Sequence, residues 1–203
     1  MKINKRNFFL NIMTTNFHAQ WIVGFVDGEG CFHLDVHRKK DMKWGLQMQP
    51  EFTVFQNEVD IQILHAFKDF FQCGSVGINR RDHHGTRYHY RVKSVKDLTE
   101  KIIPFFEKHS LKTKRKIEFQ RFRRICLLMN KGYHRKSLQH FLQIYDLGLE
   151  LHVRNKARPQ NLSLRGQKVR KIIETLRAFK KSERENFLLF KESPHKEKEY
   201  PSL

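Results

Sequence analysis

The chain of 203 residues has few cysteines and no long apolar run. Its three cysteines, Cys31, Cys73 and Cys126, are far apart and odd in number, so they form neither a disulfide framework nor a paired metal site. We therefore expect a reducing compartment and small apolar roles for the three thiols. No stretch approaches the length of a membrane span, and residues 1–5 carry neither a secretory signal nor a myristoylation motif. The sequence predicts no membrane partner.

Acidic residues are also scarce, because 21 Asp and Glu face 40 Lys and Arg, which gives a formal net charge of +19. Such an excess repels itself in a compact chain, and a polyanionic partner explains it best. Nucleic acid is favoured over an anionic membrane surface because each neutralised phosphate releases counterions. The 18 Phe residues exclude a disordered basic arm, since such arms are poor in aromatic residues. The sequence therefore indicates a folded protein that binds nucleic acid.

The hydrophobic pattern predicts the order helix, two strands, helix, two strands, helix. A first helix begins at Asn16 and ends at Gly30, Asn57 caps the second helix, and Pro104 kinks the third. The expected ranges are 16–30, 31–38, 46–56, 58–71, 74–79, 86–93 and 98–108, followed by helices over 114–129, 137–153 and 164–179. This pattern predicts the α+β class, with an αββαββα core, a four-stranded antiparallel sheet and additional C-terminal helices.

The same pattern predicts four segments along the chain. Residues 1–15 form a mobile lead-in, and residues 16–155 form the core. Residues 156–180 form a helical extension, and the charge-rich residues 181–203 form a disordered tail.

Polar residues alternate with apolar ones along the expected strands, so each strand has one apolar and one hydrogen-bonding face. A solvated sheet face is the ordinary explanation. Here the polar set is rich in His and Gln, which suits reading of base edges better than solubility alone. The residues expected to contact nucleic acid are His33, Asp35, His37, Arg38, Gln47, Gln49, Glu51, Thr53, Arg80, Arg81, Arg87, His89 and Arg91. A zinc site at His83, His84 and His89 is a weaker alternative, because no cysteine pair accompanies them and their spacing matches no common zinc site.

Gly24 and Gly28 are spaced by one helical turn and remove side chains from one face of the first helix. A second helix could approach this face, either from the same chain or from another copy. Because the chain contains one such segment, a second copy across a two-fold axis is favoured. That axis would bring two copies of Glu29 together at a basic surface, where a divalent cation such as Mg²⁺ would relieve their repulsion.

This segment resembles the nine-residue signature of the LAGLIDADG homing-endonuclease family. The stretch reads Ile22, Val23, Gly24, Phe25, Val26, Asp27, Gly28, Glu29, Gly30, and its specific matches are Gly24, Asp27, Glu29 and Gly30. The basic residues 111–116, and the block from Leu127 through Gly132 and His134, also resemble members of this family. The resemblance covers roughly residues 16–155.

The resemblance implies roles for individual residues. Glu29 matches the metal-binding catalytic acid, and Asp27 matches the second acidic position, which serves the helix end at the dimer interface with Gly24 and Gly28. Gln56 falls where a polar residue lies beside the attacking water, and Lys114 where a basic residue lies near the scissile phosphate. Lys112 and Lys116 are further candidates for DNA contact and for the second active-site cation, because Asp60 stands where related dimers carry a basic residue.

The function that the resemblance implies is a site-specific, Mg²⁺-dependent double-strand DNA endonuclease. It would act as a homodimer whose two sheets form a saddle over a long, partly palindromic DNA site, and it would leave 3′ overhangs. The alternative is an RNA-binding maturase that helps its own intron to splice, although a maturase has no need of Glu29. A basic ribosomal-type protein is less favoured, since it would not require the glycine face. The resemblance to organelle-encoded members of the family implies a chloroplast or mitochondrion. The missing transit peptide is compatible with either, because a chain encoded within an organelle needs no import signal.

Overall fold

The computed structural model describes residues 18–83, 85–152 and 164–192. Helix α2 (Ala19–Glu29) leads directly into β1 (Gly30–Arg38), and β2 (Leu46–Asn57) follows. After a 3₁₀ turn (Glu58–Asp60), α3 (Ile61–Phe71) precedes β3 (Ser75–Asp82) and β4 (Gly85–Val92). The remaining helices are α4 (Val95–Asp97), a π-helix (Leu98–Ile102), α5 (Ile103–Lys108), α6 (Arg115–Asn130), α7 (Tyr133–Lys136), α8 (Leu138–Leu149) and α9 (Leu164–Glu192). The predicted fold class is confirmed.

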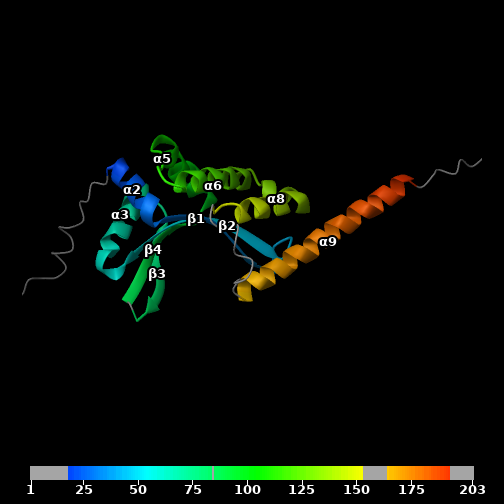
Figure 1. The fold of residues 1–203 in the computed structure, drawn as a ribbon, viewed down its shortest axis with the longest axis horizontal. Coiled ribbons are helices and arrows are strands. Elements are labelled where there is room, and N and C mark those ends of the chain that lie inside the picture. Colours follow the sequence, from blue (N-terminus) through cyan, green and yellow to red (C-terminus); the bar gives the residue numbers. More distant parts are fainter. Residues whose placement is uncertain (1–17, 84, 153–163, 193–203) are drawn as a thin grey trace, which may run out of the picture.

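The four strands form one antiparallel sheet in the order β1-β2-β4-β3. Helices α5, α6 and α8 cover one face of this sheet, α2 and α3 lie at one end, and α9 extends away at the opposite end (Figure 1). The sheet is therefore a layer whose two faces have different surroundings.

Aromatic side chains fill the space between the sheet and the helices. Phe32 of β1 stacks on Phe52 of β2 with ring centroids 5.2 Å apart, and it meets Phe106, Phe119 and Phe122 from the covering helices. All five rings are at most 5% exposed. Edge-to-face and offset contacts of this kind add to the free energy gained from burying apolar area. We call this side of the sheet the apolar face.

Two helix boundaries differ from those predicted. The expected cap at Asn16 lies outside the described residues, and α2 begins at Ala19 with His18 before it. The helix ends where it was predicted to end, because Gly30 follows its last residue and is extended, with φ of −77° and ψ of 154°. Glycine is needed there for space, since a Cβ would lie 2.5 Å from Cγ1 of Val26. Asn57 makes no side-chain cap, and a 3₁₀ turn separates it from α3.

The C-terminal half contains elements that the sequence pattern did not predict. The expected kinked helix at residues 98–108 is a π-helix followed by α5, with Pro104 in the first turn of α5. The short helix α7 was not predicted. Helix α9 continues to Glu192, past the expected boundary at residue 180 and into the expected tail, while residues 1–15 lie outside the described residues. Among the described helices, none is both long and apolar enough to cross a membrane.

Candidate active site and nucleic-acid interface

Helix α2 has one buried and one open face. Ile22, Val23 and Val26 are at most 2% exposed and pack into the core. On the other side, Gly24 and Gly28 are exposed, and a Cβ at either position would meet no atom within 4 Å. An intramolecular helix contact, the simpler explanation of the two glycines, is therefore absent within the described residues.

Asp27 lies at the end of α2 and links it to the segment before α6. Its carboxylate accepts hydrogen bonds from the backbone N–H of Lys112 (2.8 Å) and of Thr113 (3.1 Å), and from the Thr113 hydroxyl (2.8 Å). Three such bonds to one carboxylate are strong because the acceptor is charged. Asp27 therefore fixes the basic segment that contains Lys112, Lys114 and Lys116 next to the end of α2. The sequence did not single out Thr113 for this contact.

Glu29 is the last residue of α2, and its side chain is 49% exposed. Nη2 of Arg87 on β4 lies 3.7 Å from Oε2 of Glu29. The pair joins the end of the helix to the sheet at a point open to solvent. An exposed ion pair of this length contributes little to stability, so the Glu29 carboxylate keeps its capacity for another cation.

The other predicted catalytic residues lie near the same end of the sheet. Gln56 lies two residues after Val54, and Val54 pairs with Gly30 across the strands. The side-chain oxygen of Gln56 accepts a hydrogen bond from the Asn57 backbone N–H at 2.8 Å. Lys114 is exposed at the N-cap of α6, one residue after the Thr113 contact with Asp27. Lys114 thus lies next to the end of α2. Gln56 pairs with Tyr88, so by strand alternation it shares a side of the sheet with Val54 and not with Arg87.

The side of the sheet opposite the apolar face carries most of the predicted DNA-contacting residues, and we call it the polar face. Residues paired across antiparallel strands share a face. The register pairs His33 with Glu51, Asp35 with Gln49, His37 with Gln47, Thr53 with Arg91, and Asn57 with Arg87, and His89 pairs with Phe55 on the same side. Lys93, which was not predicted, follows Arg91 by two residues and therefore has the same orientation.

Two predicted contacts fall on the other side. Arg38 pairs with Leu46, which is 2% exposed and belongs to the apolar core. The bulge between Ile78 and Arg80 keeps Arg80 opposite Arg87, whereas Arg81 pairs with Thr86 and points the other way. Arg38 and Arg81 thus lie on the apolar side of the sheet, away from the other predicted DNA-contacting residues, and their contact with DNA stays a prediction.

The polar face is more enclosed than predicted. Glu51 is 3% exposed and Thr53 is 1% exposed, so neither presents a free side chain to solvent. Both were expected to face bases directly. Long side chains cover Glu51, because nitrogen atoms of Arg91 and Lys93 lie 3.4 Å and 3.1 Å from its carboxylate.

Several buried polar atoms of the polar face lack a partner. Within the described residues, no hydrogen bond reaches Thr53 Oγ1, Arg87 Nε, His89 Nδ1 or Arg91 Nε. Arg91 Nε is within ion-pair distance of Glu51 but outside hydrogen-bond geometry. Buried polar groups are normally satisfied, so four unpaired atoms on one face indicate a surface completed by another molecule or by water.

Burial also changes the protonation of two histidines on this face. Desolvation lowers the pKa of His33, and Glu51 and Asp35 oppose that shift. Desolvation is also the main reason that the pKa of His89 is lowered, with Arg91 adding to it. Both imidazoles therefore favour the neutral form, which can both donate and accept a hydrogen bond.

The fit of a divalent metal depends on the acids available. In the described parts of the chain, no three His, Cys, Asp or Glu side chains form a group able to hold a metal ion. The zinc alternative therefore has no support there, and His84 lies outside the described residues. Mg²⁺ usually binds one or two carboxylates and keeps water and phosphate oxygens as its other ligands. The exposed Glu29 fits such a shared site better than an all-protein cage.

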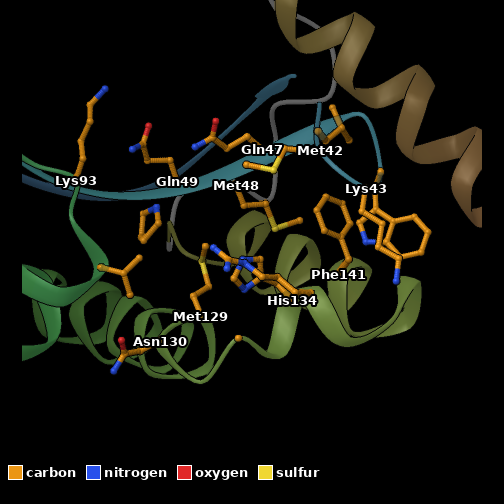
Figure 2. Close-up of a pocket in the computed structure, with 16 residues that line it drawn as sticks. Met42, Lys43, Gln47, Met48, Gln49, Lys93, Met129, Asn130, His134 and Phe141 are labelled. Atoms are coloured by element: carbon orange, nitrogen blue, oxygen red, sulfur yellow. The ribbon is translucent and has the colours of Figure 1, made fainter. Parts of the chain in front are cut away.

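A pocket of about 650 Å³ lies on the apolar side of β2. Figure 2 shows Met48 pointing from β2 towards Met129, His134 and Phe141 of the helices, while Gln47 and Gln49 point to the other side of the strand. The same strand thus supplies apolar walls to the pocket and amides to the polar face.

Comparison with known proteins agrees with this geometry. Residues 22–126 match the family model described as LAGLIDADG endonuclease. The chain is 27% identical over 132 residues to "Probable intron-encoded DNA endonuclease 1" of Mycosarcoma maydis, covering 65% of this chain and 45% of that protein. It is 30% identical over 99 residues to "DNA endonuclease I-CvuI" of Chlorella vulgaris, covering 46% of this chain and 60% of that protein. The chain thus spans less than two thirds of either relative.

Solved structures give the same result. The homing endonuclease I-TnaI superposes with a TM-score of 0.65 and 36% identity, covering 80% of this chain and 99% of that chain. I-LtrWI bound to its target DNA has a TM-score of 0.63 at 23% identity, covering 70% and 46%, and supports the fold alone. Because the family model matches residues 22–126, more than half of the 203 residues, this chain belongs to the LAGLIDADG endonuclease family.

Proposed function

We propose that the protein is a site-specific, divalent-metal-dependent endonuclease that cuts both strands of DNA as a homodimer. The observation that carries this proposal is the position of Glu29, half exposed at the end of a helix face that lacks side chains at Gly24 and Gly28. A second copy packed on that face would place two Glu29 carboxylates near one axis. The curated relatives named as DNA endonucleases support DNA as the partner.

Each of the three predicted catalytic residues has a separate role in the proposed reaction. When bound, a divalent cation supplies Lewis-acid polarisation of the phosphate and lowers the pKa of a bound water. Glu29 would hold that cation, and Gln56 would orient water beside the phosphate. Lys114, fixed next to α2 by the Asp27 contacts, would neutralise charge on the phosphate. The remaining parts of the proposal are a partly palindromic site, 3′ overhangs and an organelle-encoded gene, in line with the intron-encoded relatives.

The catalytic part is tested by selecting cleaved duplexes from a random DNA library in Mg²⁺. Glu29→Gln is expected to abolish cleavage while preserving binding, because the amide keeps the shape and loses the charge. Glu100→Gln, a change at an exposed acid of the π-helix, is the matched control and should cut normally. Cleavage retained by Glu29→Gln would remove the catalytic assignment.

The dimer is tested at the two open glycines. Gly24→Leu with Gly28→Leu should stabilise α2 within one chain, since glycine is a poor helix former by about 1 kcal/mol and the site has room. The same pair should prevent association, as measured by sedimentation of the protein with and without DNA. Gly30→Ala is the control, because its Cβ would collide with Val26 and lower stability without touching the open face. A wild-type monomer on DNA would contradict the shared axis.

The RNA-binding maturase remains the second candidate, since the basic charge suits either nucleic acid. No observation in the fold favours it over cleavage.

A further inference from the structure

The acid at the centre of the polar face has an unusual environment. Glu51 lies on β2, and its side chain is 4% exposed although the surrounding face is open to a partner. Burying a charge is unfavourable unless paired groups compensate it. The partners of Glu51 therefore determine what this side chain does.

Two cationic side chains and one imidazole, from the two strands that flank β2, contact Glu51. Nζ of Lys93 lies 3.1 Å from Oε1, while Nε of Arg91 lies 3.4 Å and Nε2 of His33 lies 3.5 Å from Oε2. His33 comes from β1, and Arg91 and Lys93 come from β4 and the residue after it. Both carboxylate oxygens are thus engaged, and one acid connects three adjacent strand segments.

These contacts leave Glu51 poorly placed to accept a hydrogen bond from a base. Its basic partners are more accessible, with side chains 34%, 25% and 44% exposed for His33, Arg91 and Lys93. Nε of Arg91 faces Glu51, and the terminal nitrogens of the guanidinium are the atoms that would form a bidentate contact with guanine. The groups able to read DNA are therefore the partners of Glu51.

We propose that Glu51 is a specificity-determining positioning residue, whose carboxylate holds Arg91, Lys93 and His33 in one arrangement on the polar face. The inference rests on the proposed function and adds to it. Base discrimination at several base pairs then depends on a side chain that contacts no base. A direct reader would instead control one base pair.

Glu51→Gln is the informative change because it preserves the size of the side chain and removes the charge that holds Arg91, Lys93 and His33 in place. The amide replaces one acceptor oxygen with an NH₂ donor, which must face the donors of Lys93 or those of Arg91 and His33. At least one basic side chain is released, and it can then contact phosphates without regard to sequence. Total affinity for duplex DNA should stay equal or rise, while discrimination between sequences falls.

The experiment is a binding selection on duplex DNA with a randomised central segment, carried out without divalent metal. The wild type should enrich a defined sequence, and Glu51→Gln should lose about tenfold in preference at two or more base pairs. Glu100→Gln is the control, since Glu100 is an exposed acid of the π-helix, which packs against α6 and not on the polar face. It should leave the Glu51-dependent base pairs unchanged.

Several results would overturn the inference. They are a loss confined to one base pair, no change in Glu51→Gln, the same loss in Glu100→Gln, or a wild type that binds duplexes without preference. Thermal melting separates loss of the fold from loss of discrimination. If Glu51→Gln does not fold, Glu51→Asp replaces it, because the shorter side chain cannot reach all three partners. Glu51→Asp should reduce base preference at the same base pairs, by a smaller factor. Cleavage of the selected duplexes in Mg²⁺ tests the proposed function separately.

Discussion

The two faces of the sheet are made by the same strands and yet differ in how completely the chain satisfies them. On the apolar face, Phe32 and Phe52 are 0% exposed and are enclosed by rings from the covering helices. On the polar face, Thr53 and Arg91 also have buried atoms, but these atoms lack hydrogen-bond partners among the described residues. One face is closed by the protein itself, and the other is left incomplete.

This difference separates stability from recognition. Close packing makes the apolar face sensitive to any change in volume. Unpaired polar atoms reduce the stability of the free protein and become favourable when a ligand supplies the missing partners. Changes on the first face should therefore act on folding, and changes on the second should act on binding with small or opposite effects on folding.

The largest effect is expected at the centre of the apolar face. Phe32→Ala should lower the free energy of unfolding by about 3–5 kcal/mol, because it removes a ring that contacts four others and leaves a cavity. Urea denaturation monitored by circular dichroism measures this change. A loss below about 1 kcal/mol would mean that the apolar face is not the core described above.

A smaller effect of the opposite sign is expected at Thr53. Thr53→Val keeps the shape of the side chain and removes a buried hydroxyl that has no partner, so the free protein should gain about 1 kcal/mol in stability. Duplex affinity should fall if the hydroxyl is completed by DNA. Set beside Phe32→Ala, the stability change of Thr53→Val compares the two faces. A loss of stability in Thr53→Val would show that the hydroxyl is already satisfied.

Charge on the two sides of the sheet gives a third comparison. Arg80 pairs across the strands with Arg87, on the polar face, whereas Arg124 is exposed on α6 over the apolar face. Arg80→Met should reduce the slope of log affinity against log salt by about 0.9, as expected for one phosphate contact. Arg124→Met should leave the slope unchanged. Equal effects would place DNA elsewhere than on the polar face.

The sequence predicted the elements that depend on local periodicity. Alternation along β1 assigned Phe32 and His33 to opposite faces, and the helical spacing of Ile22 and Val26 assigned the buried side of α2. The roles of Glu29, Gln56 and Lys114 remain predictions that the geometry makes possible. The buried faces of β1 and α2 could be read from the sequence because each is determined by the alternation of a few neighbouring residues.

The features that were missed arise from tertiary contacts. The bulge near Asn79 reverses the orientation expected for Arg81, and the packing against Val26 determines why residue 30 is glycine. The burial of Glu51 follows from side chains on two other strand segments. Lys93 could have been found, because it continues the alternation of Arg91 into the end of the predicted strand.

The smallest expected effect is a pH dependence that arises from the polar face. Burial lowers the pKa of His89, so between that value and the ordinary histidine pKa the unfolded chain binds more protons than the folded one. Stability should therefore be complete above about pH 7 and fall as the solution is acidified below about pH 6.5. His89→Gln removes this contribution and should make the decline shallower in thermal melting, while His33 and His134, whose pKa values are also lowered by burial, keep theirs.

His134 lies on the apolar side, in the pocket next to Phe141. The decline that survives in a His33→Gln, His89→Gln double variant would thus measure the apolar side alone, and an unchanged decline would mean that the polar face does not exclude protons in the folded state.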